Sequence, residues 1–230
     1  LTDPGRVIEG RKAAPQGRHP RSWPSTANYF VPSLLGTFHG RFPGVTVSLD
    51  VTNRETLLRQ LDENRVDLVV MGQPPEGANL EAGTFMENPL VIVAPPDHPL
   101  AKQKGIPFSR LEDEVFLTRE RGSGTRSAIE RFFEQHGVQL NTGMEIASNE
   151  AIKQSVQAGL GLGLLSRDTL DMELALKKLV ILDVEDFPIV RYWYVMHRKG
   201  KRLSTVAQAF KQFLLEEANA LLHAEAKGKN

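Results

Sequence analysis

Apolar residues in the first third of the chain recur at spacings that alternate between those of a helix and those of a strand. After Ser25-Thr26, whose hydroxyl groups suit a helix start, apolar side chains return every three or four residues until Pro43-Gly44. Residues 45–51 then alternate between apolar and polar, which is the period of a strand. A second helix capped by Asn53 and an apolar strand at 66–71 follow. The predicted order is therefore helix, strand, helix, strand.

A short apolar run, Leu90 to Ala94, stands between Pro89 and Pro95-Pro96. Proline cannot donate to a strand ladder and keeps the residue before it extended, so this run predicts a buried strand that begins and ends abruptly. The order of helices and strands before this strand resembles the order after it, and we interpret the strand as a bridge between two similar lobes. A long apolar stretch at 189–196 predicts a second crossing that returns the chain to the first lobe.

The second lobe repeats the order of the first. Its helices are expected to start at Gly122–Thr125 and at Ser148-Asn149. Its strands are expected at 115–118, 144–148, 162–165 and 179–184. Strands that alternate with helices favour parallel sheets with helices on both faces. The predicted divisions are a disordered or vector-derived segment over 1–24, subdomain I over 25–92 and 191–222, subdomain II over 93–190, and a frayed tail over 223–230.

The composition restricts the function more by what it excludes than by what it favours. The 230 residues carry a formal net charge of zero, whereas a domain that holds duplex DNA by its own surface usually has a basic surplus. The chain has no cysteine, which excludes disulfides and cysteine-bound metals and fits a cytoplasmic protein. No apolar run approaches the roughly 20 residues that span a bilayer, so no membrane partner is expected.

Enzymatic signatures are largely missing from the sequence. The six histidines show no short-range pairing of the kind that binds metals. Gly159, Gly161 and Gly163 precede a strand instead of opening a helix after one, so they predict a tight turn and not a dinucleotide site. We therefore expect no catalytic residue, no metal and no cofactor.

The predicted helix starts provide a different kind of candidate site. Ser25-Thr26, Asn53, Gly122–Thr125 and Ser148-Asn149 each open a helix, and a helix N-terminus presents unpaired N–H groups and a positive dipole end. Two come from each lobe, and together they suit an anionic ligand in a cleft. Arg121 and Arg126 flank the glycine-rich start and could add charge-assisted hydrogen bonds. Each residue at a predicted helix start can also be an ordinary cap, and each of the two arginines can also be a solvated surface residue.

The same stretches carry a specific resemblance. Five motifs are similar to the effector-binding domain of LysR-type transcriptional regulators, over roughly residues 23–222: 25–32, 42–45 with Asn53-Arg54, 66–70, 89–91 with 97–100, and 158–163. The opening Ser25–Phe30 and the loop Gly122–Arg126 resemble the subgroup that controls carbon-fixation (RuBisCO, Calvin-cycle) operons.

The resemblance implies an α/β fold of two Rossmann-like subdomains, of the periplasmic-binding-protein type, joined by two crossover strands. It implies a homodimer or homotetramer and a small anionic effector in the interlobe cleft, for this subgroup a phosphorylated metabolite or NADPH. DNA is expected to be bound only through an N-terminal winged helix-turn-helix that this sequence lacks. With the residue pattern, the candidate effector contacts are Ser25, Thr26, Asn53, Gln73, Arg121, Gly122, Ser123, Gly124, Thr125, Arg126, Ser148 and Asn149.

Two other classes of protein remain open at this stage. A periplasmic-type solute-binding protein shares the two-lobed plan, and an enzyme could use the same scaffold. A solute-binding protein is expected to be a monomer and a regulator domain a dimer or larger, so the oligomeric state separates the first two classes.

Overall fold

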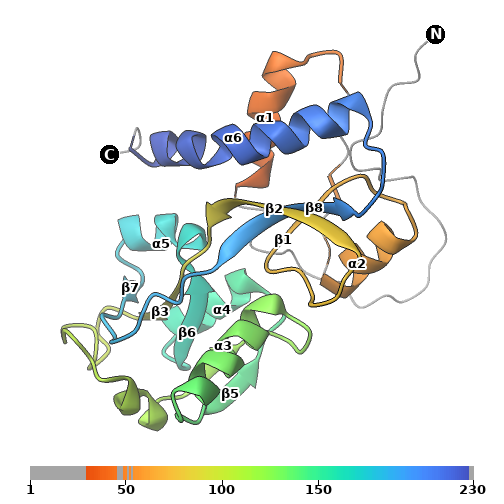
Figure 1. Cartoon of the computed structure of the whole chain (residues 1–230). Helices are drawn as coiled ribbons and strands as arrows, with labels where there is room; N and C mark the ends of the chain where they lie inside the picture. The colour runs from red at the N-terminus through yellow and green to blue at the C-terminus, as the bar shows by residue number, and fades with distance from the viewer. Residues whose placement is uncertain (1–29, 46–48, 51, 53, 228–230) are drawn as a thin grey trace, which may run out of the picture. The chain divides into compact units, whose positions relative to one another are not determined.

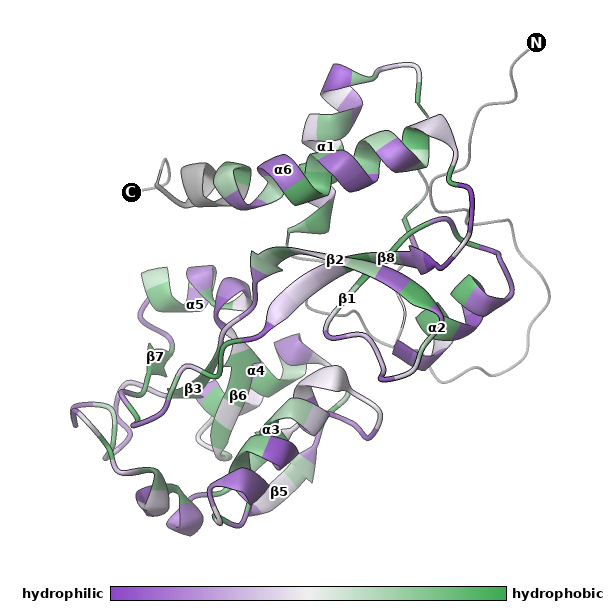
Figure 2. Ribbon diagram, in the orientation of Figure 1, coloured by the Kyte–Doolittle hydropathy of each residue, from purple (hydrophilic) through white to green (hydrophobic). Residues whose placement is uncertain are grey.

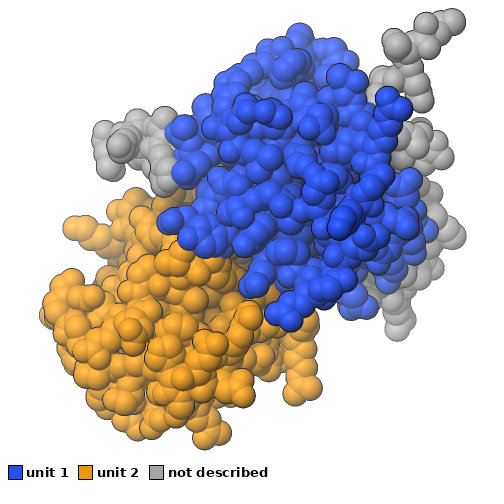
Figure 3. Space-filling view, in the orientation of Figure 1, with its two compact units in different colours: residues 1–87, 192–230 blue, residues 88–191 orange. Residues whose placement is uncertain are grey.

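A computed structural model describes residues 30–45, 49–50, 52 and 54–227, with side chains described as far as Leu221. The chain divides into two compact units (Figure 3). Unit 1 holds the chain up to Glu87 and from Tyr192 onward, and unit 2 is Asn88–Arg191. Each unit has its own sheet and its own hydrophobic core.

Unit 1 is built on a three-stranded sheet with the order β1-β8-β2, in which β8 is antiparallel to both neighbours (Figure 1). Its elements are α1 (Val31–Arg41), α2 (Arg54–Asp62), β1 (Val69–Met71), β2 (Leu80–Glu87), β8 (Tyr192–Arg198) and α6 (Thr205–Lys227).

Strand β8 separates the two cores of unit 1, because successive side chains of a strand point to opposite faces. Trp193 and Val195 pack with residues of α1 and α6, among them Phe38 and Phe210, whose rings meet edge to face at 5.0 Å. Met196, on the other face, packs with residues of β1 and α2. The helices α1 and α6 therefore cover one face of the sheet and α2 the other.

Unit 2 is built on a five-stranded mixed sheet with the order β5-β4-β6-β3-β7. Its strands are β3 (Leu90–Ala94), β4 (Phe116–Thr118), β5 (Thr142–Glu145), β6 (Leu162–Ser166) and β7 (Val180–Ile181). Its helices are α3 (Gly124–Gln135), α4 (Asn149–Gln157), α5 (Asp171–Ala175) and the 3-10 turns Phe108–Asp113 and Arg167–Thr169.

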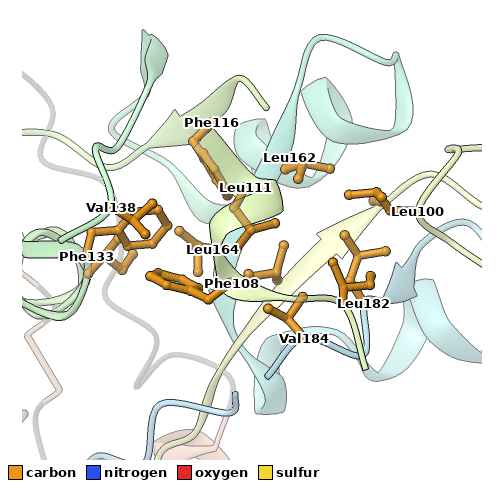
Figure 4. Packing of buried hydrophobic residues seen from close by; sticks show 14 of the residues in the cluster. Leu100, Phe108, Leu111, Phe116, Phe133, Val138, Leu162, Leu164, Leu182 and Val184 are labelled. Carbon is orange, nitrogen blue, oxygen red and sulfur yellow. The ribbon is translucent and has the colours of Figure 1, made fainter. Parts of the chain in front are cut away.

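The strand β3 is buried along its whole length and is apolar throughout (Figure 2). Leu90, Ile92 and Ala94 point into the core beneath α3, and Val91 and Val93 point into the core beneath α4 and α5. Figure 4 shows the first of these cores, in which the rings of Phe108 and Phe133 meet at 4.9 Å. Here α3 covers one face of the sheet and α4 the other.

The α/β class is confirmed, but two parts of the prediction are wrong. Strand β3 is not a bridge: it pairs with β6 and β7 of unit 2, so the first boundary falls after Glu87 and not after residue 92. The sheets are also not parallel throughout. Among the described strands only β4 pairs in parallel, with β5 and β6, whereas β8 is antiparallel to β1 and β2, and β3 is antiparallel to β6 and β7.

Several element predictions also change. Strand β2 and helix α5 were not predicted at all. The helix α6 runs to Lys227, past the end expected at residue 222, and Ala224, Glu225 and Ala226 are good helix formers. The first helix begins at Val31, with Phe30 at its N-cap, and its expected start at Ser25-Thr26 lies outside the described residues. The strand expected at 45–51 falls largely outside them too.

Candidate anion site in unit 2

The strands β4 and β5 are parallel neighbours, so their carboxyl ends lie at one edge of the unit 2 sheet. After β4 the chain enters α3 on one face, and after β5 it enters α4 on the other face. The backbone N–H of Ile146 donates to the carbonyl of Thr118 at 2.8 Å, which keeps the two loops together. In open α/β sheets, the ligand usually binds at the edge where two neighbouring strands are followed by helices on opposite faces of the sheet.

The loop before α3 is shaped by its glycine. Gly122 has φ +85°, a left-handed conformation that other residues rarely adopt, and nothing would meet a Cβ added there. Ser123 stands at the N-cap, but its side chain makes no capping hydrogen bond, and the first turn of α3 contains no acidic residue. The N–H groups and the dipole at this helix end are therefore not satisfied by the usual side chains.

Arg126 is already neutralised by two carboxylates. Its Nε donates to Glu130 at 2.7 Å, and its Nη1 donates to Glu145 and to the carbonyl of Arg119. The hydrogen bond to Glu130 is the main reason that the pKa of Arg126 is raised, and the hydrogen bond from Arg126 is the main reason that the pKa of Glu145 is lowered. Arg126 thus stabilises the ends of α3 and β5 and has little charge left for a ligand.

The loop after β4 is tied to the start of α4 by a buried arginine. Arg119 donates to both carboxylate oxygens of Glu120, at 2.7 and 2.9 Å, and its Nη1 donates to Oδ1 of Asn149 at 2.7 Å. Both Arg119 and Asn149 are only 5% exposed. The amide oxygen of Asn149 therefore accepts a hydrogen bond from the protein itself.

The N-terminus of α4 is capped in the ordinary way. The hydroxyl of Ser148 accepts a hydrogen bond from the backbone N–H of Ala151 at 3.3 Å. Glu150 lies in the first turn, where a negative charge complements the dipole, and it also pairs with Lys153 at 2.7 Å. This helix end has its own cap and its own anion.

A second arginine, which is partly buried, reaches the site from the end of unit 2. Arg191 donates from Nη1 to the hydroxyl of Thr125, in the first turn of α3, at 3.4 Å. Its Nε and Nη2 are buried and have no hydrogen-bond partner among the described residues. Burial lowers the pKa of Arg191 to about 10, which still leaves the guanidinium charged at neutral pH.

The predicted contacts fall into three groups. The loop Arg121–Arg126 and the pair Ser148-Asn149 lie at this edge of unit 2. Gln73 follows β1 in unit 1 and is exposed. Ser25, Thr26 and Asn53 lie outside the described residues.

Two residues of the site were not predicted. Arg119 follows the apolar strand β4, and Arg191 is the one charged residue in the apolar stretch 189–196. For Arg191, a charged residue inside an otherwise apolar run was the available signal. Within the described residues, no three His, Cys, Asp or Glu side chains are grouped so that they could hold a metal. None of the described helices is long and apolar enough to cross a membrane.

Residues 22–219 match the family described as the LysR substrate binding domain, and the chain belongs to the LysR family. It is 50% identical over 218 residues to the RuBisCO operon transcriptional regulator of Allochromatium vinosum, covering 95% of this chain and 72% of that protein. It is 44% identical over 201 residues to the HTH-type transcriptional activator CmpR of Synechocystis, covering 87% of this chain and 66% of that protein. The chain thus spans about two thirds of the length of these relatives.

The structure is similar to the regulatory domain of CcmR from Synechocystis, which was solved in complex with 2-PG. The TM-score is 0.79 at 46% sequence identity, with 83% of this chain and 91% of that chain covered. The effector binding domain of QuiR has the same fold, with a TM-score of 0.73 at 22% identity, covering 82% of this chain and 90% of that chain. The expected family and its two-subdomain fold are confirmed.

Proposed function

We propose that the chain is the effector-sensing domain of a regulator of carbon-fixation genes and that its effector is a phosphorylated metabolite of the 2-PG class. The observation that carries the proposal is the 46% identity to a CcmR domain bound to 2-PG, a phosphorylated metabolite. The unit 2 site supports it, since the first turn of α3 has no acidic residue and no side-chain cap. Such a helix end suits a phosphate group.

The remaining properties of the whole protein belong to the same proposal. The effector shifts the regulator between two states because it binds one state more tightly than the other. DNA contact is assigned to a helix-turn-helix segment outside residues 1–230, as the names of the HTH-type relatives suggest. We further infer a homodimer or homotetramer that works in the cytoplasm and catalyses no reaction.

Calorimetric titration of the purified chain tests the ligand class. The panel is 2-PG, inorganic phosphate, ribulose bisphosphate, NADPH and the non-phosphorylated carboxylate cis,cis-muconate. We expect saturable binding of 2-PG and no heat from cis,cis-muconate. Binding of the carboxylate alone would keep the regulator and refute the phosphorylated effector. Light scattering of the same sample gives the oligomeric state, and a monomer would contradict that part of the proposal.

A further inference from the structure

Among the described lysines and arginines, only Arg191 has buried side-chain nitrogens without a hydrogen-bond partner. The other buried cations are compensated. Arg119 binds Glu120 through two hydrogen bonds, and Lys153 lies 2.7 Å from Glu150 and 2.9 Å from Glu173. No described carboxylate pairs with Arg191, and its single hydrogen bond, to the hydroxyl of Thr125, is long at 3.4 Å.

A buried cation without an anion destabilises a protein, because neither water nor a partner replaces its lost hydration. Desolvation is also the cause of the lowered pKa of Arg191, and no charged neighbour counteracts it. Such a group is expected where a ligand supplies the missing charge, since binding sites often hold groups that are costly when empty.

The direction of the unsatisfied groups fits an oxyanion. Nε and Nη2 lie on one edge of the guanidinium, and this edge forms two parallel hydrogen bonds to the oxygens of a carboxylate or phosphate. The third nitrogen, Nη1, contacts Thr125 in the first turn of α3, the helix whose N-cap side chain makes no capping bond. The guanidinium and the free helix end therefore lie beside each other within unit 2.

We propose that Arg191 is the charged anchor of the effector site and that it holds an oxyanion group of the effector, phosphate or carboxylate, against the N-terminus of α3. The inference rests on the proposed function, which it makes more specific: it names one residue that sets the preference for anionic effectors.

The test uses Arg191→Met, which keeps most of the side-chain volume and removes the charge, and Arg191→Lys, which keeps the charge and removes the two-pronged geometry. Arg110→Met is the matched control, since Arg110 is exposed and its side chain pairs, among the described residues, with Asp113 alone, at 2.8 Å. Each variant is titrated with 2-PG and with inorganic phosphate, and its melting temperature is measured without ligand.

We expect Arg191→Met to weaken 2-PG binding on the order of 10- to 100-fold and Arg191→Lys to weaken it about 10-fold. Arg110→Met is expected to bind as the unchanged chain does. The melting temperature of ligand-free Arg191→Met is expected to stay the same or rise, because an uncompensated buried charge is removed. If inorganic phosphate binds the unchanged chain but not Arg191→Met, the group held by Arg191 is the phosphate. If Arg191→Met loses 2-PG binding and inorganic phosphate does not bind even the unchanged chain, the group held by Arg191 is the carboxylate.

Full 2-PG affinity in Arg191→Met would overturn the inference and leave the proposed function intact. So would a lower melting temperature of this variant without ligand, since Arg191 would then be a structural residue. An unchanged chain that binds no anion of the panel would refute the proposed function, and the inference with it.

Discussion

Helices α3 and α4 begin at the same edge of the unit 2 sheet, yet their N-termini differ. Both follow a serine at the N-cap. In α4 the hydroxyl of Ser148 caps the backbone, Glu150 adds a negative charge, and Asn149 is held by Arg119. In α3 the side chain of Ser123 makes no cap bond.

The difference teaches that a cap residue in the sequence does not show whether a helix end is free to bind a ligand. What decides is whether the N–H groups and the dipole are already satisfied by the protein. By this criterion the N-terminus of α4 is closed, meaning that the protein itself satisfies its N–H groups and dipole, and the N-terminus of α3 is open. Arg191, which has no anionic partner among the described residues, lies beside the open end. Three predictions test this contrast.

The largest effect is expected from Arg119→Met, which removes the arginine that holds the start of α4. Glu120 and Asn149 would each lose their hydrogen bonds from Arg119, and breaking a pair whose arginine is buried costs about 3 kcal/mol of the free energy of unfolding. Urea denaturation measures the loss, and Arg110→Met is the control. A change below about 0.5 kcal/mol, the size of an ordinary surface substitution, would show that Arg119 does not hold the closed end.

A smaller effect with the opposite sign is expected from Thr125→Asp, which closes α3 from within. The new carboxylate would lie near the guanidinium of Arg191 and at the positive end of the helix, so the ligand-free domain should gain about 1.5 kcal/mol. The same variant should lose 2-PG binding, because the internal anion occupies the site. Thr125→Asn, of the same size but neutral, is the control. If Thr125→Asp still bound 2-PG normally, the open end of α3 would not be the anion site.

The smallest effect is expected from removing the two cap hydroxyls in turn. Ser148→Ala loses a capping hydrogen bond and should cost about 1 kcal/mol, whereas Ser123→Ala loses no such bond and should cost only a few tenths. Thermal or urea unfolding of the two variants gives the comparison. Equal costs at the two positions would contradict the assignment of one closed and one open helix end.

Much of the fold could be predicted because local patterns carry it. The helical spacing of apolar residues located α2, α3, α4 and the start of α6 closely, and the apolar run at 162–165 located β6. Strand β2 was missed because its Leu80–Glu87 sequence is mostly exposed and lacks a clear alternation, with a register shift between Thr84 and Met86. Its pairing with β8, more than a hundred residues later, specifies it.

The candidate site could be predicted only in part. The glycine-rich loop before α3 and the serine before α4 were found from their cap chemistry, and the structure brings them to one edge. Arg126 was predicted as an anion binder, but Glu130 and Glu145 already pair with it. The roles of Arg119 and Arg191 could not be predicted, since Arg119 reaches Asn149 and Arg191 reaches Thr125 only through the fold, and two nitrogens of Arg191 have no partner among the described residues.

The sequence by itself determined the family, the α/β class and the starts of α3 and α4, because these depend on short-range patterns and motifs. The tertiary structure alone decided the direction of strand pairing, the unit to which β3 belongs and which charges are already paired. The physical reason is that pairing and burial depend on residues far apart in the chain. Arg191 illustrates this: the sequence shows only an arginine in an apolar stretch, whereas the fold buries two of its guanidinium nitrogens with no described carboxylate to pair with them.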